Sequence, residues 1–459
     1  MSVIRPLIRL LPGTRLSRLT GALSLALAAS PASAIDLMQA YERALSQDAS
    51  YQAARADTDA RREAVPQALA QLMPNVSSNL SRSKNITEQR SPNVLGTLGK
   101  TNYEYFSSNY GISLRQPLFR KYNFALYRQA KSDVETAEAT LDKSLQDLVV
   151  RMAGTYFDAL MAKAQYALII AQKNAYGLQL AAAKQSFAKG QGTVIDVDDA
   201  QARYDMTVAQ ELEALQNLSY TRRALQVIVN EPVENVADLV PARMELTPPF
   251  PDNVEEWIER AEETNPELRA LRASMESANQ ELAKARSGHY PTADLFVQRS
   301  MSESDNNVSI NSRYLTSQAG VQVSIPLFSG GYVSSQMRQA RANIQKIEQQ
   351  YEGRRREIRL QVRKEYQNIT EGIAKIQALQ QAERSAERAL DSNQKGLPAG
   401  TRSLVDILNA QQQLINAKRD LVQARLTYIL ARVRLQGLVS SLNEKEIQTI
   451  NNWLETPRS

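Results

Sequence analysis

The 459-residue sequence contains no cysteine and only one histidine, His289. Without cysteine the chain has no disulfide framework, no lipid-modified N-terminal cysteine and no thiolate metal site. A single histidine weighs against the usual histidine-based zinc sites and against the serine and cysteine triads. We therefore expect a protein that is not an enzyme and that needs no cofactor or metal.

Long apolar runs are also scarce. After residue 34 no run approaches the ~20 apolar residues of a membrane-spanning helix. The one clear run, 19–29, follows a basic segment without acids and precedes the small residues Ala32-Ser33-Ala34. This pattern predicts a secretory signal peptide over residues 1–34 and an exported mature chain.

The net positive charge of the mature chain is smaller than that of the full sequence. The net charge of +6 includes four arginines of the signal segment, and without them the mature part carries about +2. Such a weak balance gives no reason to expect nucleic acid as a partner.

Two halves of the chain repeat each other. Glu42-Arg43-Ala44 recurs 217 residues later as Glu259-Arg260-Ala261, and the segment 111–119, ending in Pro-Leu-Phe, recurs 209 residues later as 320–328. We therefore expect a first repeat over 35–230 and a second over 254–442. The proline-rich linker 231–253 and the polar tail 443–459 remain, and both are expected to pad the helical part at mid-height.

Each repeat has the pattern of a helix, a non-helical excursion, a long helix, a bend and a further helix. Apolar residues at mixed spacings of three and four predict antiparallel coiled-coil packing. At 1.5 Å per residue, roughly 65 helical residues give a rod about 100 Å long, which two shorter helices stacked end to end would match. The expected helices cover 37–72, 121–188 and 193–229 in the first repeat, and 254–288, 333–394 and 403–442 in the second.

The excursions 75–117 and 292–326 change to a period of two, which predicts β-hairpins. We expect strands of ~10 to 12 residues, long enough to cross a bilayer as tilted barrel strands, with polar loops at 84–102 and 302–313. Four strands cannot close a barrel, and open edges are not tolerated in lipid. Several chains must therefore share one barrel, although the count alone does not choose between two chains and three.

The two bends have a common pattern. Gly190 and Gly400 are each followed six residues later by an aspartate, Asp196 or Asp406. Thr193-x-x-Asp196 and Ser403-x-x-Asp406 also have the form of a capping box at the start of a helix.

The repeat, the proline-bounded hairpins, the Pro-Leu-Phe ends and the bend at 400–406 resemble the TolC family of outer-membrane channel proteins. The resemblance implies a homotrimer with a shared twelve-stranded β-barrel in the outer-membrane lipid of a Gram-negative bacterium. It also implies an α-barrel that crosses the periplasm and engages a periplasmic adaptor protein and an inner-membrane transporter. The function implied is an exit duct for type I protein secretion or small-molecule efflux, which inspection does not separate.

The resemblance also implies a gate at the bends. Arg402 matches the family's gate arginine, Asp196 the aspartate of the first bend that it binds, and Asp406 one of two aspartates that ring the constriction. Two positions depart from the family pattern, because Leu397 replaces a tyrosine and Asn409 replaces the second ring aspartate. The implied closed state then has fewer bonds and one carboxylate ring.

Other interpretations stay open from sequence alone. Asp406 has two readings, as a helix cap and as a member of a carboxylate ring in the pore. The basic run around 354–364 is interpreted as a solvated coiled-coil face paired with acids of neighbouring helices. The rival functions are a cell-surface structural or adhesive coiled-coil rod and a periplasmic adaptor, neither of which explains two membrane-length strand pairs.

Overall fold

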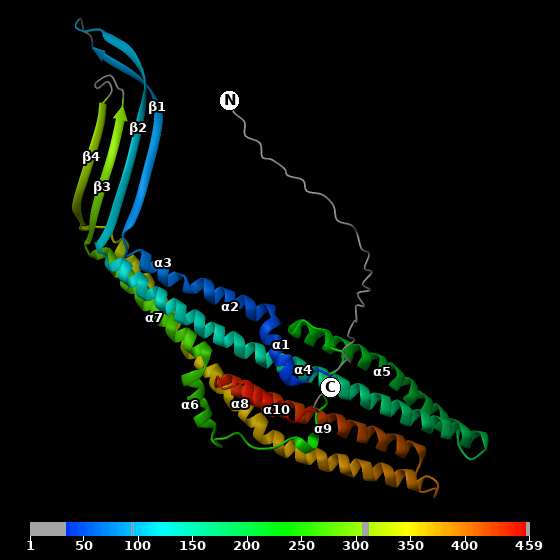
Figure 1. The fold of residues 1–459 in the computed structure, drawn as a ribbon. Coiled ribbons are helices and arrows are strands. Elements are labelled where there is room, and N and C mark those ends of the chain that lie inside the picture. Colours follow the sequence, from blue (N-terminus) through cyan, green and yellow to red (C-terminus); the bar gives the residue numbers. More distant parts are fainter. Residues whose placement is uncertain (1–33, 93, 95, 305–311, 456–459) are drawn as a thin grey trace, which may run out of the picture.

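The computed structural model describes residues 34–92, 94, 96–304 and 312–455 (Figure 1). A four-stranded sheet lies at one end of the molecule and a bundle of long helices extends from it to two bends at the other end. The prediction of a mostly helical chain with four strands is confirmed. The predicted signal segment lies, apart from Ala34, outside the described residues.

Two helical hairpins build the part far from the sheet. Helix α4 (Lys121–Ala188) pairs with α5 (Val194–Val229), and α8 (Tyr332–Gly396) pairs with α9 (Leu404–Leu438), close to the expected ranges. The hairpins contact each other mainly through α4 and α9. None of the helices described is both long enough and apolar enough to pass through a bilayer.

The shorter helices are broken at points that the sequence analysis did not predict. Instead of one helix over 37–72 there are α1 (Leu37–Gln47), α2 (Ala49–Arg62) and α3 (Ala64–Ala70), and instead of one over 254–288 there are α6 (Val254–Thr264), α7 (Pro266–Arg286) and the 3-10 turn η2 (Ser287–His289). Asp48 accepts a hydrogen bond from the Tyr51 N–H, and Asn265 accepts from the Glu267 N–H. Each side chain thereby caps a new helix.

The break in the second repeat brings two helices end to end. Thr264 Oγ1 donates to the Val439 carbonyl at 2.8 Å, and Asn265 Nδ2 donates to the Leu438 carbonyl at 2.9 Å. The start of α7 therefore meets the end of α9, as expected for stacked shorter helices. In the first repeat the matching contact is weaker, from Asn230 Nδ2 to Gln47 Oε1 at 3.3 Å.

The sheet is antiparallel in the order β1-β2-β3-β4, with strands β1 (Asn75–Pro92), β2 (Leu98–Phe119), β3 (Thr292–Ser304) and β4 (Ser312–Ser324). The predicted loop 84–102 is wrong, since both strands continue through most of it. Cross-strand ion pairs support this polar ribbon: Lys84 binds Glu104 at 2.8 Å, and Lys100 binds Glu88 at 2.6 Å. Diagonal charge pairs of this kind stabilise strands that have little apolar surface.

Both edges of the sheet are open in the described part of the chain. β1 pairs only with β2, and β4 pairs only with β3. Apolar side chains on these edge strands are well exposed, among them Val76, Leu80, Leu315, Val321 and Val323. A single chain thus presents strand edges and apolar surface that need a partner.

The main core lies at mid-height, where the linker, the tail and the helix breaks meet. Tyr156 of α4 is fully buried, and its hydroxyl donates to the Ile35 carbonyl at 3.1 Å. The linker contains the short turn η1 (Pro241–Arg243), and Leu239 forms a β-bridge with Leu454 of the tail. Helix α10 (Glu444–Asn451) adds Asn451 Oδ1, which accepts from the Leu37 N–H at 2.9 Å.

Candidate functional site

The two bends lie together at the end of the molecule opposite the sheet (Figure 1). Gly190 has φ 69° and Gly400 has φ 68°, both in the left-handed region that residues with a Cβ disfavour. The Gly190 N–H donates to the Phe187 carbonyl, and the Gly400 N–H donates to the Leu397 carbonyl. The backbone of each bend therefore favours the glycine that the sequence places there.

Asp196 and Asp406 lie in the first turn of the second helix of each hairpin. Thr193 Oγ1 accepts from the Asp196 N–H at 3.2 Å, while the Thr193 N–H donates back to Asp196 Oδ2 at 3.1 Å. Ser403 and Asp406 exchange the same two bonds at 3.2 and 2.9 Å. Both predicted capping boxes are confirmed.

The electrostatics at Asp406 fit this cap. Hydrogen bonds from the Ser403 N–H and hydroxyl, with a smaller effect of the nearby Arg402 charge, hold the pKa of the Asp406 carboxyl below its usual value. The negative charge also interacts favourably with the N-terminus of α9. Pore lining by Asp406 in an assembled protein stays a prediction.

Arg402 and Leu397 flank the second bend. Within the described chain Arg402 makes no hydrogen bond to Asp196, whose carboxylate is engaged by Thr193. Leu397 caps the end of α8 and is 37% exposed. A bond from Arg402 to Asp196 across the bends of neighbouring copies stays a prediction.

Asn409 has a partner that sequence reasoning missed. Its Oδ1 accepts from Arg203 Nη2 of α5 at 2.8 Å. Asn409, which stands where the family resemblance implies a ring aspartate, is therefore hydrogen-bonded to the α4–α5 hairpin of the same chain.

Further polar contacts join α4 to α9 above the bends. Gln412 Oε1 accepts from Gln172 Nε2 at 2.8 Å and from the Tyr176 hydroxyl at 3.1 Å. Gln172 and Tyr176 are 3% and 2% exposed. The sequence gives one sign of this contact: Gln172 occupies a position of α4 where the helical spacing predicts an apolar residue.

The basic run of α8 pairs with acids of α6 and α7, as predicted. Arg354 binds Glu267 at 2.7 Å, and Arg359 binds Glu262 at 2.6 Å. Arg363 extends the series to Glu255 at 2.7 Å. The run therefore fastens the long helix to its shorter neighbours.

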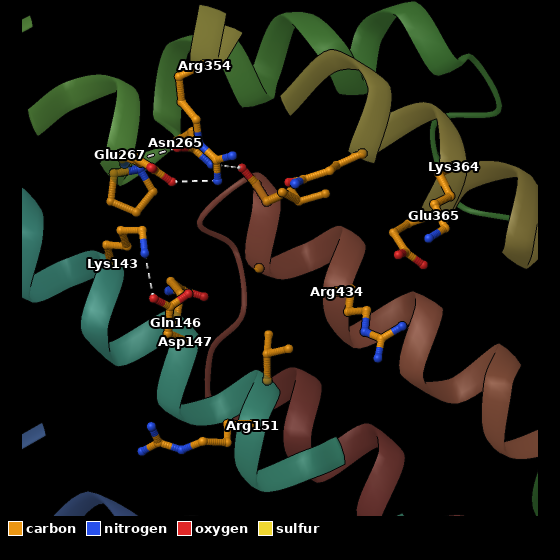
Figure 2. A pocket seen from close by; sticks show the side chains of 15 residues that line it. Lys143, Gln146, Asp147, Arg151, Asn265, Glu267, Arg354, Lys364, Glu365 and Arg434 are labelled. Atoms are coloured by element: carbon orange, nitrogen blue, oxygen red, sulfur yellow. Dashed lines mark hydrogen bonds and ion pairs between the residues drawn. The ribbon is translucent and has the colours of Figure 1, made fainter. Parts of the chain in front are cut away.

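A cavity of about 440 Å³ lies near mid-height between α4, α7, α8 and α9 (Figure 2). Ion pairs line it, including Lys143 with Asp147 at 2.7 Å and Arg354 with Glu267. Glu365, 7% exposed, accepts from Asn368 at 3.0 Å. No group of three or more His, Cys, Asp or Glu side chains with the arrangement of a metal site occurs among the described residues.

Comparisons with known proteins cover both repeats. The family described as "Outer membrane efflux protein" matches residues 40–231 and 257–441. The chain is 31% identical over 442 residues to the proteases secretion protein PrtF of Dickeya chrysanthemi, covering 94% of each chain. It is 32% identical over 419 residues to the alkaline protease secretion protein AprF of Pseudomonas aeruginosa, covering 91% of this chain and 87% of AprF.

Solved structures show the same fold. The outer membrane protein VceC of Vibrio cholerae superposes with a TM-score of 0.74 at 20% identity, over 89% of this chain and 97% of VceC. The superposition therefore covers most of the length of both chains.

Proposed function

The chain belongs to the outer membrane efflux protein family, and we propose that it is the protein-conducting exit duct of a tripartite export system. It is an outer-membrane channel protein that extends into the periplasm, with its strands in the membrane and its helices below them. We assign it a homotrimeric state and two kinds of partner, a periplasmic adaptor and an inner-membrane transporter.

The observation that carries the proposal is the open sheet joined to a long helical rod. Four strands with two free edges cannot stand alone in lipid, where every backbone polar group needs a partner. Three copies would supply twelve strands and close the barrel. The free face of α5, where Met206, Tyr220 and Val227 are 62%, 70% and 80% exposed, supports lateral contact with another copy.

Protein cargo is favoured over small molecules by the relatives. PrtF and AprF, which are similar along most of their length, are both named as protease secretion proteins. The family description itself speaks of efflux, so small-molecule export is the alternative. Secretion of a protein substrate by cells that carry the chain with its transporter and adaptor decides between the two.

We place the gate at the bends, with Gly190 and Gly400 shaping the backbone. In the closed trimer Arg402 of one copy would bind Asp196 of the next, and Asp406 would line the constriction beside Leu397. An exposed bond of this kind contributes only ~0 to 1 kcal/mol, which suits a gate that must open. The capping boxes support the proposal by holding each carboxylate in a fixed position.

Single-channel conductance of the purified mature protein in a planar bilayer tests the duct and the gate together. We expect a trimer by mass measurement in detergent and a small conductance that rises in Arg402→Ser. Arg388→Ser is the matched control, because Arg388 is an exposed arginine of α8 upstream of the bend. No conductance from a folded trimer would refute the proposed duct. Equal conductance of the two variants would refute the proposed role of Arg402 in the gate.

The absence of cysteine allows a direct test of the Asp196–Arg402 contact. The double variant Asp196→Cys/Arg402→Cys would carry the only two thiols of the chain. Oxidative crosslinking should give covalent dimers and trimers on a denaturing gel if the contact joins neighbouring copies. Crosslinked monomers alone would place the contact within one subunit and contradict the proposed arrangement.

A further inference from the structure

We propose that six polar residues form a latch within each subunit, which holds the α8–α9 hairpin against the α4–α5 hairpin in the closed channel. The latch residues are Gln172, Tyr176, Arg203, Asn409, Gln412 and Asn416. The inference rests on the proposed function, because a latch matters only if one hairpin moves against the other. It adds a restraint that is separate from the contact between neighbouring bends.

The centre of the latch is the side-chain amide of Gln412. Its Oε1 accepts two hydrogen bonds from α4, from Gln172 Nε2 at 2.8 Å and from the Tyr176 hydroxyl at 3.1 Å. Its Nε2 donates to Asn416 Oδ1 at 3.1 Å. Gln172 Nε2 also lies 3.2 Å from the Tyr176 hydroxyl oxygen. Both hydrogen-bonding groups of the Gln412 amide are thus used, and its oxygen joins the two hairpins.

Burial makes this arrangement selective for one position of the hairpins. Gln172 and Tyr176 are almost fully buried, and an unsatisfied polar group in such a place is costly. A slide of α9 along α4 would separate both donors from Gln412 Oε1. Apolar contacts alone would tolerate such a slide more easily, since they lack direction.

A cavity beside the latch offers a way to release it. It measures about 280 Å³, lies between α4, α5 and α9, and is lined by both apolar and amide side chains, the amides including Gln172, Gln210, Asn217, Gln412 and Asn416. A cavity of this size with several amide groups can hold water, which would replace the lost partners once the helices separate. The latch can therefore open reversibly.

The second part of the latch lies nearer the bend. Arg203 Nη2 of α5 donates to Asn409 Oδ1 of α9 at 2.8 Å, in a more exposed setting. Toward the bends the latch adjoins a small separate core of Tyr176, Leu180, Ala183, Ala200, Leu404 and Leu408. Tyr176 belongs to both, so the polar bonds lie next to an apolar contact between the same hairpins.

Gln412→Leu tests the buried part, with Gln413→Leu as control because Gln413 is exposed on the same helix. We expect Gln412→Leu to shift the closed-to-open equilibrium by roughly tenfold or more toward open, which at 1.4 kcal/mol per factor of ten is within the range for orphaned buried donors. Single-channel conductance of the mature trimer measures the shift, after circular dichroism and mass confirm its assembly. Equal conductance of an assembled Gln412→Leu trimer and the control would overturn this part of the latch.

Asn409→Asp tests the exposed part without removing a side chain. Opposite Arg203 the new carboxylate should form an ion pair and lower the conductance of the leaky Arg402→Ser background, by up to about fivefold at low salt. High salt and the further change Arg203→Gln should each abolish the effect. A decrease that persists with Arg203→Gln, or no decrease at all, would overturn the latch at Asn409.

These experiments separate the latch from the function on which it rests. If neither wild type nor Arg402→Ser conducts, the duct itself is refuted, and the latch as a gating element is refuted with it. If Arg402→Ser conducts but the latch variants have the same conductance as their controls, the proposed duct is supported and only the latch is refuted.

Discussion

The helix break at Asp48 gives a prediction whose size follows from its contacts. Asp48 is 6% exposed and ends α1 while it caps α2. Its Oδ1 accepts from the Tyr51 N–H at 2.9 Å and from Ser50 Oγ at 2.5 Å, and its Oδ2 accepts from Arg151 Nη2 at 2.7 Å. The second repeat makes the equivalent break with the neutral Asn265, so the geometry of the cap is separable from the charge.

Asp48→Asn should therefore cost much less than Asp48→Ala. An asparagine keeps an acceptor for the Tyr51 N–H, but its amide nitrogen is a donor and replaces the oxygen that accepts from Arg151. The ion pair and hydrogen bond with Arg151 are therefore lost, at about 1 kcal/mol or less, because the half-exposed guanidinium can turn to water. Alanine also removes the cap, at about 1 kcal/mol, and leaves buried donors unpaired at about 1 to 3 kcal/mol. We expect a total near 3 kcal/mol for Asp48→Ala.

Urea unfolding of the mature protein in detergent, at one protein concentration for all variants, measures the difference. Asp57→Asn is the control, because Asp57 lies on the same helix in an exposed pair with Arg61 and should change the free energy of unfolding by less than about 0.5 kcal/mol. If Asp48→Asn destabilises as much as Asp48→Ala, charge rather than cap geometry maintains the break. If Asp48→Ala changes the free energy of unfolding as little as Asp57→Asn, the Asp48 side chain does not stabilise the break as argued.

Two further predictions concern acid and the bend. Burial alone raises the pKa of the Asp48 carboxyl, but hydrogen bonds from Ser50 and Tyr51 together with Arg151 outweigh it and hold the pKa below its usual value. The stabilisation by the Asp48 charge is thus complete above pH ~4, the pKa of an unfolded aspartate, and is lost as pH falls through the lower folded pKa. The free energy of unfolding of Asp48→Asn should therefore depend less on pH in that window. Equal acid sensitivity of the wild type and Asp48→Asn would contradict the assignment. Gly400→Ala should destabilise the protein by ~1 to 2 kcal/mol, because Gly400 has a φ of 68°. Gly353→Ala should stabilise it by ~0.5 to 1 kcal/mol, because Gly353 lies inside α8 with open space around it. Thermal unfolding that ranks the two variants in the opposite order would refute the backbone argument.

The sequence predicts the long helices well because nothing interrupts their apolar spacing for tens of residues. The breaks at Asp48 and Asn265 escaped prediction because one capping residue inside a good helical sequence costs little locally, and tertiary contacts decide whether the helix stops. Pro266, at the first position of α7, was the available sign. The strands were drawn too short because charged residues in 84–102 suggested a loop, although they pair across the ribbon.

The candidate site was predictable only where it is local. A glycine followed by an aspartate at fixed spacing specifies each bend and its cap, and all of these residues are neighbours in sequence. The contacts of Arg203 and Gln172 join residues 206 and 240 positions apart, so no local pattern reveals which residues are their partners. They depend on which faces of α4, α5 and α9 meet, which only the folded chain determines.

The unequal strand lengths also determine which part of the sheet extends furthest from the helices. The four-stranded register ends where Ser107 faces Ser304, whereas β1 and β2 continue to pair as far as Pro92 and Leu98. Figure 1 shows this two-stranded, charge-rich extension, and a trimer would carry three of them. Because the extension takes no part in the four-stranded register, substitutions in it would leave the shared wall of the barrel intact.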